Sequence, residues 1–310
     1  SIGSSKRVDS SHIGRVETIP KFPGPGGFGS TRPGELIKVM PSMNELASFA
    51  KAFLLLAVKV VVLVAGLFLV VSHWIADSML FHRFPASYEW GDRYFGVDMP
   101  EGYSVACRFL PNRSSQYLII TSHGNAEDLG RIEPLLLGFR DAGLNVLAYD
   151  YPGYGLSGGN ASEKSCNEAI EAVTRYAVEQ LGFSTEQIIL HGRSLGSGPT
   201  VEMAIRDRFA GVILESAFKS AFSVVIGTDS LPWDRFRNLR KAPMIDEPTL
   251  VIHGGRDEVV PFSHGMALFE AIEAPKLHYW ADSAGHNDLV AQLGDEYWEL
   301  IAEFVGSIGG

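Results

Sequence analysis

A short apolar run, a G-x-S-x-G pentapeptide and a helix-forming run follow one another between residues 187 and 205. This order constrains the fold more than any other part of the sequence. The pentapeptide, Gly192–Gly196, has Ser194 at its centre. Between a strand and a helix, such a turn lifts the serine hydroxyl above a sheet, and the flanking glycines leave room for the strained backbone. The free N–H groups at the start of the helix stabilise negative charge beside it. The sequence therefore predicts a nucleophilic serine.

Apolar strand-like runs and amphipathic helical runs alternate from about residue 88 to residue 308. Strands are predicted at 105–110, 117–121, 145–149, 187–191, 211–214, 249–252 and 276–280, and helices at 163–181, 198–205 and 287–304. Strands that are apolar throughout are typical of a parallel sheet covered by helices on both faces. We therefore predict an α/β fold with a mainly parallel central sheet.

The composition excludes some classes of function. A formal net charge of −10 without basic clusters argues against nucleic acid as a partner. Cys107 and Cys166 form neither a disulfide framework nor a metal-ligand spacing, and we expect both to be buried.

The N-terminal part of the chain divides into two segments. Residues 1–44 are rich in Ser, Gly and Pro, which predicts a disordered tail. Residues 45–76 are predicted as a transmembrane anchor, because the run from Ala52 to Val71 is interrupted only by Lys59 and is long enough to cross the hydrocarbon core. A buried core helix and a cleaved signal peptide are the alternatives, although a signal peptide does not fit so far from the N-terminus.

Basic residues flank the predicted span unequally. Arg32, Lys38 and Lys51 precede it, and Arg83 is the first basic residue after it. Because positive charge is enriched on the cytoplasmic side, this asymmetry favours a catalytic domain on the non-cytoplasmic side.

A serine hydroxyl is a weak nucleophile at neutral pH, so Ser194 needs a base, and the base needs an orienting carboxylate. In sheets with such a turn, the acid and then the histidine follow the serine, each on a loop after a strand. Asp257 follows the predicted strand 249–252, and His286 follows the predicted strand 276–280. We therefore predict Ser194, Asp257 and His286 as the catalytic residues.

Three other residues compete for the roles of acid and base. Glu258 is next to Asp257 and could replace it as the acid, while His253 and His264 are alternative bases. His253 lies at the end of a predicted strand and His264 in the helix that follows, whereas His286 lies in a loop at the required place. His286 is therefore the preferred base.

The negative charge that develops on the substrate oxygen needs hydrogen-bond donors. One donor is the backbone N–H of Leu195, next to the nucleophile. The second is expected from the loop after an early strand, where Gly124 permits close approach and Asn125 presents its N–H. His123 and Gly124 are predicted to support this loop, although they also fit an ordinary strand-to-helix turn.

Four motifs carry a family resemblance, and they lie in order at residues 122–130, 149–157, 191–196 and 285–288. They resemble the membrane-anchored α/β-hydrolase-domain proteins, which include the bud-emergence-type serine hydrolases and the related palmitoyl-protein thioesterases. The resemblance implies an α/β-hydrolase fold over residues 85–306, with Ser194, Asp257 and His286 as a triad. The chain has a hydrophobic span where the depalmitoylating members have an N-terminal cysteine cluster, which matches the bud-emergence type better.

The segment 217–246 is an apolar insert between two predicted strands. It is too short for a large cap domain, so it either covers the site as a short lid or packs on the sheet as a crossover helix.

Together these features predict a single-pass, membrane-anchored serine hydrolase. Its substrates would be carboxylic esters or acyl-thioesters, including lipid-derived ones, and its chemistry requires no metal or organic cofactor. A serine peptidase on the same fold and a non-catalytic scaffold are the alternatives.

Overall fold

The computed structural model describes residues 42–227 and 232–308, apart from the side chains at positions 73 and 74. The predicted tail at 1–44 therefore lies almost wholly outside the described residues. The chain divides into two compact units, Ser1–Val62 and Leu63–Gly310. The first unit contributes the start of helix α2 (Met43–Leu80), and the second contains the end of α2 and the whole sheet.

Helix α2 begins with a capping box. The Ser42 backbone N–H donates to Glu45 Oε2 at 2.7 Å, and the Glu45 N–H donates back to Ser42 Oγ at 3.3 Å. Most of the large apolar side chains between residues 46 and 71 are exposed. Among the described helices, only α2 is long and apolar enough to cross a membrane. The helix contains the whole of the predicted anchor and continues to Leu80.

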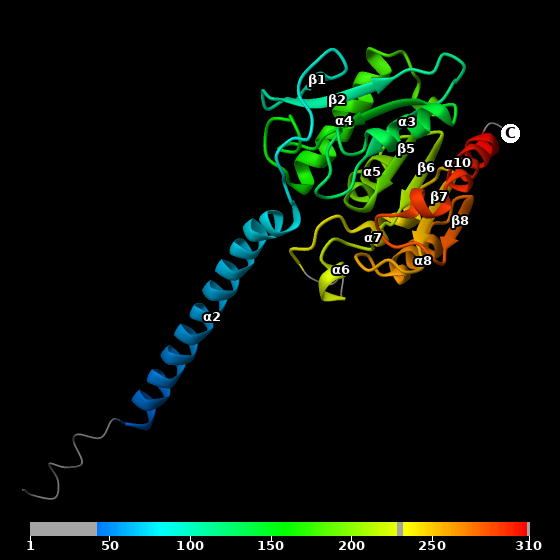
Figure 1. Cartoon of the computed structure of the whole chain (residues 1–310). Coiled ribbons are helices and arrows are strands. Elements are labelled where there is room, and N and C mark those ends of the chain that lie inside the picture. The colour runs from blue at the N-terminus through cyan, green and yellow to red at the C-terminus, as the bar shows by residue number, and fades with distance from the viewer. Residues whose placement is uncertain (1–41, 228–231, 309–310) are drawn as a thin grey trace, which may run out of the picture. The chain divides into compact units, whose positions relative to one another are not determined.

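The second unit is built on an eight-stranded sheet with the order β1-β2-β4-β3-β5-β6-β7-β8 (Figure 1). Strands β1 and β2 pair antiparallel with each other, β2 pairs antiparallel with β4, and all other pairs are parallel. The mainly parallel sheet that the apolar strands predict is thus confirmed. The strands are β1 (Phe95–Asp98), β2 (Ser104–Leu110), β3 (Leu118–Ser122), β4 (Asn145–Tyr149), β5 (Ile188–Arg193), β6 (Gly211–Glu215), β7 (Thr249–Gly254) and β8 (Lys276–Ala281).

Helices cover both faces of this sheet (Figure 1). One apolar core contains buried residues of α4, α5 and α8, and a second contains buried residues of α3, α9 and α10. Neighbouring strand residues such as Leu118 and Ile119 belong to opposite cores, because successive side chains alternate across a strand. The helices of this unit are α3 (Glu133–Asp141), α4 (Glu163–Glu179), α5 (Ser197–Ala204), α6 (Ser223–Ile226), α7 (Asn238–Lys241), α8 (Phe262–Ala271), α9 (Leu289–Leu293) and α10 (Asp295–Ile308).

Four features differ from the sequence prediction. The C-terminal helix predicted at 287–304 is divided into α9 and α10 at Gly294, whose φ of +56° a helix cannot contain. The insert 217–246 contains the short helices α6 and α7 instead of one crossover helix. Strand β1 and helix α3 were not predicted, since a four-residue edge strand has too little apolar pattern to identify it.

The parallel strands place the ends of β3, β5, β7 and β8 at one edge of the sheet. Each of the predicted site residues lies just beyond one of these strand ends. This edge is therefore the candidate functional site.

Candidate active site

Ser194 lies on a sharp turn between β5 and the short 3₁₀ helix Ser194–Gly196, which leads directly into α5. Its φ is +50°, a left-handed conformation that is strained for a residue with a side chain. The flanking glycines are sterically required. A Cβ on Gly196 would lie 2.0 Å from the carbonyl oxygen of Ser122, and a Cβ on Gly192 would lie 2.6 Å from that of Gly196. The pentapeptide is thus explained by backbone contacts at this turn.

The structure brings the three predicted catalytic residues together. His286 Nε2 lies 2.9 Å from Ser194 Oγ, and His286 Nδ1 lies 2.8 Å from Asp257 Oδ2. The other Asp257 oxygen accepts the backbone N–H groups of Val259 at 2.9 Å and Val260 at 2.7 Å. Ser194, His286 and Asp257 therefore form one continuous chain of hydrogen bonds.

A pair of glycines allows the His286 loop to reach Ser194. Strand β8 lies three positions from β5, so the loop after β8 has to cross the end of β7. A Cβ on Gly254 would lie 2.5 Å from the carbonyl oxygen of Ala284, and one on Gly255 would lie 2.9 Å from Asp282 Cα. The loop packs directly on backbone at this crossing, which no other residue type would permit.

The competing residues lie beside this chain of hydrogen bonds. Glu258 Oε2 accepts the backbone N–H of His286 at 3.4 Å. His253 is buried, with Nε2 at 3.3 Å from Asp257 Oδ2 and 3.0 Å from the Val260 carbonyl oxygen. Burial raises the pKa of Asp257, but hydrogen bonds from His253 and His286 outweigh it and hold that pKa well below its ordinary range. His253 and His286 therefore contact the same oxygen of Asp257.

His264 is the remaining alternative base. Its Nδ1 accepts the backbone N–H of Lys219 at 3.4 Å. Burial, followed by the charge of Lys219, lowers the pKa of His264 to about 4. His264 thus contacts the insert, whereas the Nε2 atom at 2.9 Å from Ser194 Oγ belongs to His286.

The predicted oxyanion loop follows β3. Gly124 lies against Ser194, since a Cβ there would be 3.7 Å from that of Ser194. Asn125 and Leu195 line the same pocket as Ser194. Leu195 lies in the first turn of the helix Ser194–Gly196, where a backbone N–H has no partner within the helix. The backbone N–H groups of Asn125 and Leu195 therefore stay the predicted oxyanion donors.

The side chain of Asn125 has a role that the sequence did not indicate. Its Oδ1 accepts the His82 backbone N–H at 3.0 Å and the Tyr154 hydroxyl at 2.7 Å, and its Nδ2 donates to the Leu80 carbonyl oxygen at 2.6 Å. Asn125 therefore joins the oxyanion loop to the end of α2.

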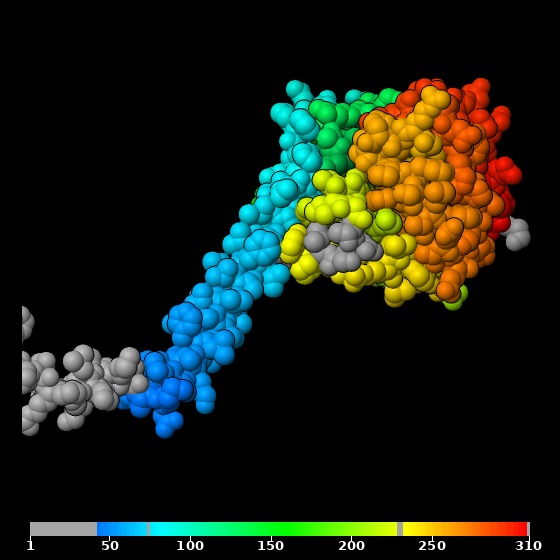
Figure 2. Space-filling view, turned by 90° about the horizontal axis from the view of Figure 1, so that it is seen from below, coloured from blue at the N-terminus to red at the C-terminus, as the bar shows by residue number. Residues whose placement is uncertain are grey.

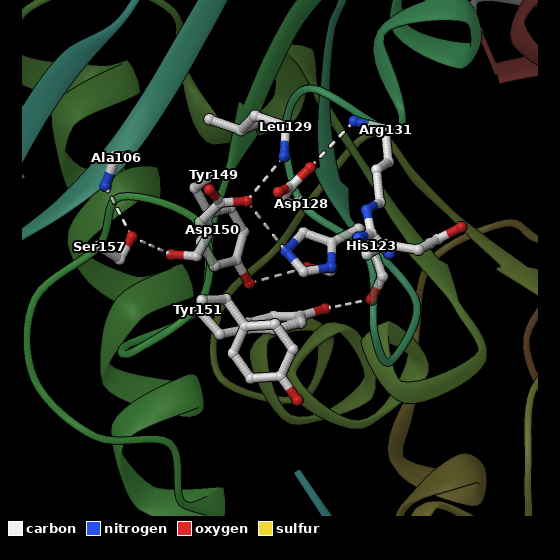
Figure 3. A network of polar contacts seen from close by, with 12 residues as sticks. Ala106, His123, Asp128, Leu129, Arg131, Tyr149, Asp150, Tyr151 and Ser157 are labelled. Carbon is white, nitrogen blue, oxygen red and sulfur yellow. Dashed lines mark hydrogen bonds and ion pairs between the residues drawn. The ribbon is translucent and has the colours of Figure 1, made fainter. Parts of the chain in front are cut away.

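A buried polar network supports the loop from below (Figure 3). His123 Nδ1 lies 2.8 Å from the Gly124 carbonyl oxygen, and its Nε2 lies 3.3 Å from Asp150 Oδ1. Burial lowers the pKa of His123, but the Asp150 carboxylate outweighs it, so the pKa is raised. Tyr151 donates its hydroxyl to the His123 carbonyl oxygen at 2.5 Å. His123 thus contacts both the Gly124 loop and Asp150, and its supporting role stays a prediction.

Arg193 occupies the first x position of the G-x-S-x-G pentapeptide and links three parts of the site. The sequence alone did not indicate this role. Its guanidinium bonds to Glu127, contacts Glu215 Oε1 at 3.1 Å and donates to the His286 carbonyl oxygen at 3.3 Å. Glu127 in turn accepts the Gly124 backbone N–H at 2.7 Å. The Ser194 turn, the Gly124 loop and the His286 loop are therefore held by one guanidinium.

An apolar pocket of about 380 Å³ opens beside Ser194. Met79 and Leu80 at the end of α2 form part of its wall. The insert supplies most of the remaining apolar lining: Phe218, Ala221, Phe222, Val224, Val225, Ile226 and Trp233. The insert therefore lines the pocket beside Ser194 and also contributes Phe218 and Phe236 to the core, and its role as a lid stays a prediction.

Comparison with known proteins gives a consistent family and fold. A family model described as "Serine aminopeptidase, S33" matches residues 113–224. The human alpha/beta hydrolase domain-containing protein 17B is 38% identical over 211 residues, which cover 66% of this chain and 72% of that protein. Alpha/beta hydrolase domain-containing protein aho-3 of Caenorhabditis elegans is 38% identical over 206 residues, which cover 65% of this chain and 61% of that protein.

Solved structures share the fold at low sequence identity. An esterase from Pyrococcus furiosus is 15% identical, with a TM-score of 0.62 over 74% of this chain and 98% of that chain. An alpha-beta serine hydrolase homologue from Coxiella burnetii is 19% identical, with a TM-score of 0.57 over 70% of this chain and 99% of that chain. These likenesses establish an α/β-hydrolase fold for the second unit.

Proposed function

The chain belongs to the alpha/beta hydrolase domain-containing protein 17 family, and on this premise we propose that it is a membrane-anchored serine hydrolase of carboxylic esters or acyl-thioesters. The observation that carries the proposal is the chain of hydrogen bonds from Ser194 Oγ through His286 to Asp257, with links of 2.9 and 2.8 Å. Family and fold support a hydrolase. The serine mechanism and the substrate class are the proposed part.

In the proposed reaction, His286 Nε2 takes the proton of Ser194 as its oxygen attacks the acyl carbon. Asp257 accepts the Nδ1–H and so fixes the tautomer that leaves Nε2 free. The backbone N–H groups of Leu195 and Asn125 hold the oxyanion. The protonated imidazole then gives its proton to the leaving alcohol or thiol, and water releases the acyl group from Ser194 by the same steps.

The apolar pocket supports an acyl substrate. Its volume of about 380 Å³ falls in the range of small-molecule sites, and its lining is mainly aliphatic and aromatic. Esterases among the solved structures of this fold point to the same class. An acyl chain in this pocket would place its carbonyl carbon at Ser194.

The apolar helix α2 is proposed as the membrane anchor. Its exposed aliphatic side chains are costly in water, and a span of about 20 residues crosses the hydrocarbon core. We also propose the orientation predicted from the flanking basic residues, with the sheet domain on the non-cytoplasmic side. Protease digestion of sealed microsomes, whose cytoplasmic face is outside, tests this orientation. A sheet domain that is protected from the protease supports it, and a digested domain contradicts it.

Covalent labelling tests the nucleophile. We expect the full chain in detergent to react with a fluorophosphonate probe, and Ser194→Ala to lose the label. Ser307→Ala is a matched control on α10, where the hydroxyl only donates to the Phe304 carbonyl oxygen. Equal labelling of the wild type and Ser194→Ala would contradict the proposed nucleophile, and an unlabelled wild type would favour a non-catalytic scaffold.

A substrate panel separates the ester and peptidase hypotheses. We expect turnover of nitrophenyl esters and acyl-thioesters of graded chain length, and little turnover of aminoacyl-arylamides. The family model described as a serine aminopeptidase is the reason to include the last class. A peptidase needs clustered carboxylates for the substrate amine, but Asp229, Asp234 and Asp246 are spread along the insert, and Asp234 is buried, where it accepts from Ser220 Oγ at 2.6 Å and the Phe222 N–H at 2.9 Å. Preferential cleavage of the arylamides would contradict the ester proposal.

A further inference from the structure

The insert between β6 and β7 carries apolar side chains that the rest of the described protein does not cover. Val225 is 85% exposed and Ile226 is 53% exposed, yet both line the pocket that contains Ser194. We name Val224, Val225, Ile226 and Trp233 the insert tip. Exposed aliphatic side chains around a pocket mouth are typical of a surface that another apolar phase covers.

The insert tip is fixed to the apolar helix. The Trp233 ring packs edge-on against the ring of Phe68, with centroids 5.5 Å apart. Close by, Arg235 Nε contacts Asp77 Oδ1 at 2.7 Å, and its Nη1 donates to the Trp233 carbonyl oxygen at 2.7 Å. Figure 2 shows the insert in yellow beside the cyan end of α2. The apolar contact and the ion pair thus hold the insert along the last turns of α2.

The position of Phe68 in α2 indicates how deep the insert tip lies relative to the membrane. Phe68 lies within the last turn of the apolar run 52–71, so in a spanning helix it reaches the edge of the hydrocarbon core. Trp233 then lies at the boundary between hydrocarbon and headgroups, where tryptophan side chains are favoured. From Phe68 to Leu80 the helix rises about 18 Å, and Leu80 already lines the pocket. The pocket is lined by both Trp233 and Leu80, so its Trp233 end lies close to this boundary and its Leu80 end lies farther from the bilayer.

Two polar side chains next to the insert tip face inward. The Asp234 carboxylate is buried and accepts two hydrogen bonds from the insert itself. Ser223 Oγ is buried and donates to the Ser220 carbonyl oxygen at 2.7 Å. With these groups satisfied internally, the insert tip presents side chains that a bilayer accepts at no cost in lost hydrogen bonds.

We propose that the insert tip is a bilayer-contact surface, through which the pocket receives an acyl chain directly from the lipid. Val225 and Ile226 enter the boundary of headgroups and acyl chains beside α2. The reacting acyl chain then passes from hydrocarbon into the apolar pocket without crossing water. This inference rests on the proposed anchor and on the proposed acyl substrate, and it adds the lipid surface as the partner of the insert.

Fluorescence quenching by lipid tests the contact without measuring activity. An environment-sensitive fluorophore is attached to Ile226→Cys in the full chain, reconstituted in phosphatidylcholine vesicles with nitroxide on a shallow acyl carbon. Leu277→Cys is the matched control, since Leu277 is 47% exposed but lies at the start of β8, at the sheet edge opposite Ser194. Cys107 and Cys166 are buried and should take up no label, which the unsubstituted chain verifies.

We expect the nitroxide lipid to quench the label at position 226 at least about twofold, since interfacial side chains lie about 5–10 Å below the headgroups, and to leave position 277 unchanged. A chain that stays in the vesicles after an alkaline wash with position 226 unquenched overturns the bilayer contact alone. Release of the chain by that wash overturns the anchor and the contact together. Equal quenching at both positions also overturns the bilayer contact. An emission of the label at position 226 that shifts to the blue with rising protein density, without quenching by the nitroxide lipid, overturns it in favour of a second copy of the chain.

Discussion

The buried carboxylate of Glu215 gives the sharpest quantitative test of the structure. Glu215 ends β6 and is 2% exposed. Its oxygens accept the Tyr297 hydroxyl at 2.6 Å and contact Arg193 Nε at 3.1 Å, with His191 Nε2 at 3.6 Å. Burial raises its pKa, but His191, Arg193 and Tyr297 outweigh burial and lower that pKa from 4.5 to about 2. The folded protein therefore favours the ionised form.

This lowered pKa has a definite sign and size in stability. Since the folded-state value lies below the unfolded one, the contribution is present above about pH 4.5 and is lost as the pH falls toward 2. A pKa lowered from 4.5 to about 2 contributes about 3 kcal/mol to the free energy of unfolding at neutral pH. At about pH 3.5 this contribution to the free energy of unfolding has fallen to about 2 kcal/mol. Glu215→Gln keeps the size and hydrogen-bonding atoms of the side chain but removes this contribution.

Thermal unfolding of the full chain in detergent, followed by tryptophan fluorescence, measures the effect. At pH 7 we expect Glu215→Gln to lower Tm by about 6–12 °C, because 1 kcal/mol corresponds to about 2–4 °C in a domain of this size. The difference in Tm between Glu215→Gln and the wild type should become progressively smaller below about pH 4.5. Glu303→Gln, on the exposed side of α10, should change nothing. A Tm equal to that of the wild type at pH 7, or a gap that is constant with pH, would refute the reasoning.

Three further substitutions probe the site itself. Asp257→Asn should lower kcat on a nitrophenyl ester by about 10³–10⁴-fold with little change in KM, since it leaves His286 in the wrong tautomer; a kcat within tenfold would contradict the role of the acid. Gly196→Ala places a Cβ 2.0 Å from a backbone oxygen and should destabilise the fold by more than about 3 kcal/mol, whereas Gly91→Ala, with open space around it, should not; melting curves compare them. Arg193→Lys should lower kcat at least about tenfold, because one ammonium cannot hold three loops; unchanged kinetics would show that the guanidinium only fills space.

The features that were predictable from the sequence are local ones. Apolar strands between amphipathic helices indicate a parallel sheet from periodicity alone, and the glycines around Ser194 reflect contacts within a single turn. Asp257 and His286 were identifiable because chain order and the position of loops after strands restrict the choice. The break of the last helix at Gly294 was missed, since a helical pattern continues on both sides of a single glycine.

Long-range partners were decided only by the tertiary structure. Nothing in the sequence around Arg193 indicates that it joins Glu127, Glu215 and the His286 loop, because these segments meet only through strand order. His253 likewise competes as a base in sequence and becomes a second partner of Asp257 in space. The contact of Trp233 with Phe68 joins residues far apart in the chain, and it places the insert beside the apolar helix. Periodicity and steric fit are properties of neighbouring residues, so the sequence determined the sheet and the nucleophile turn, whereas the surroundings of each charge depend on how distant loops pack.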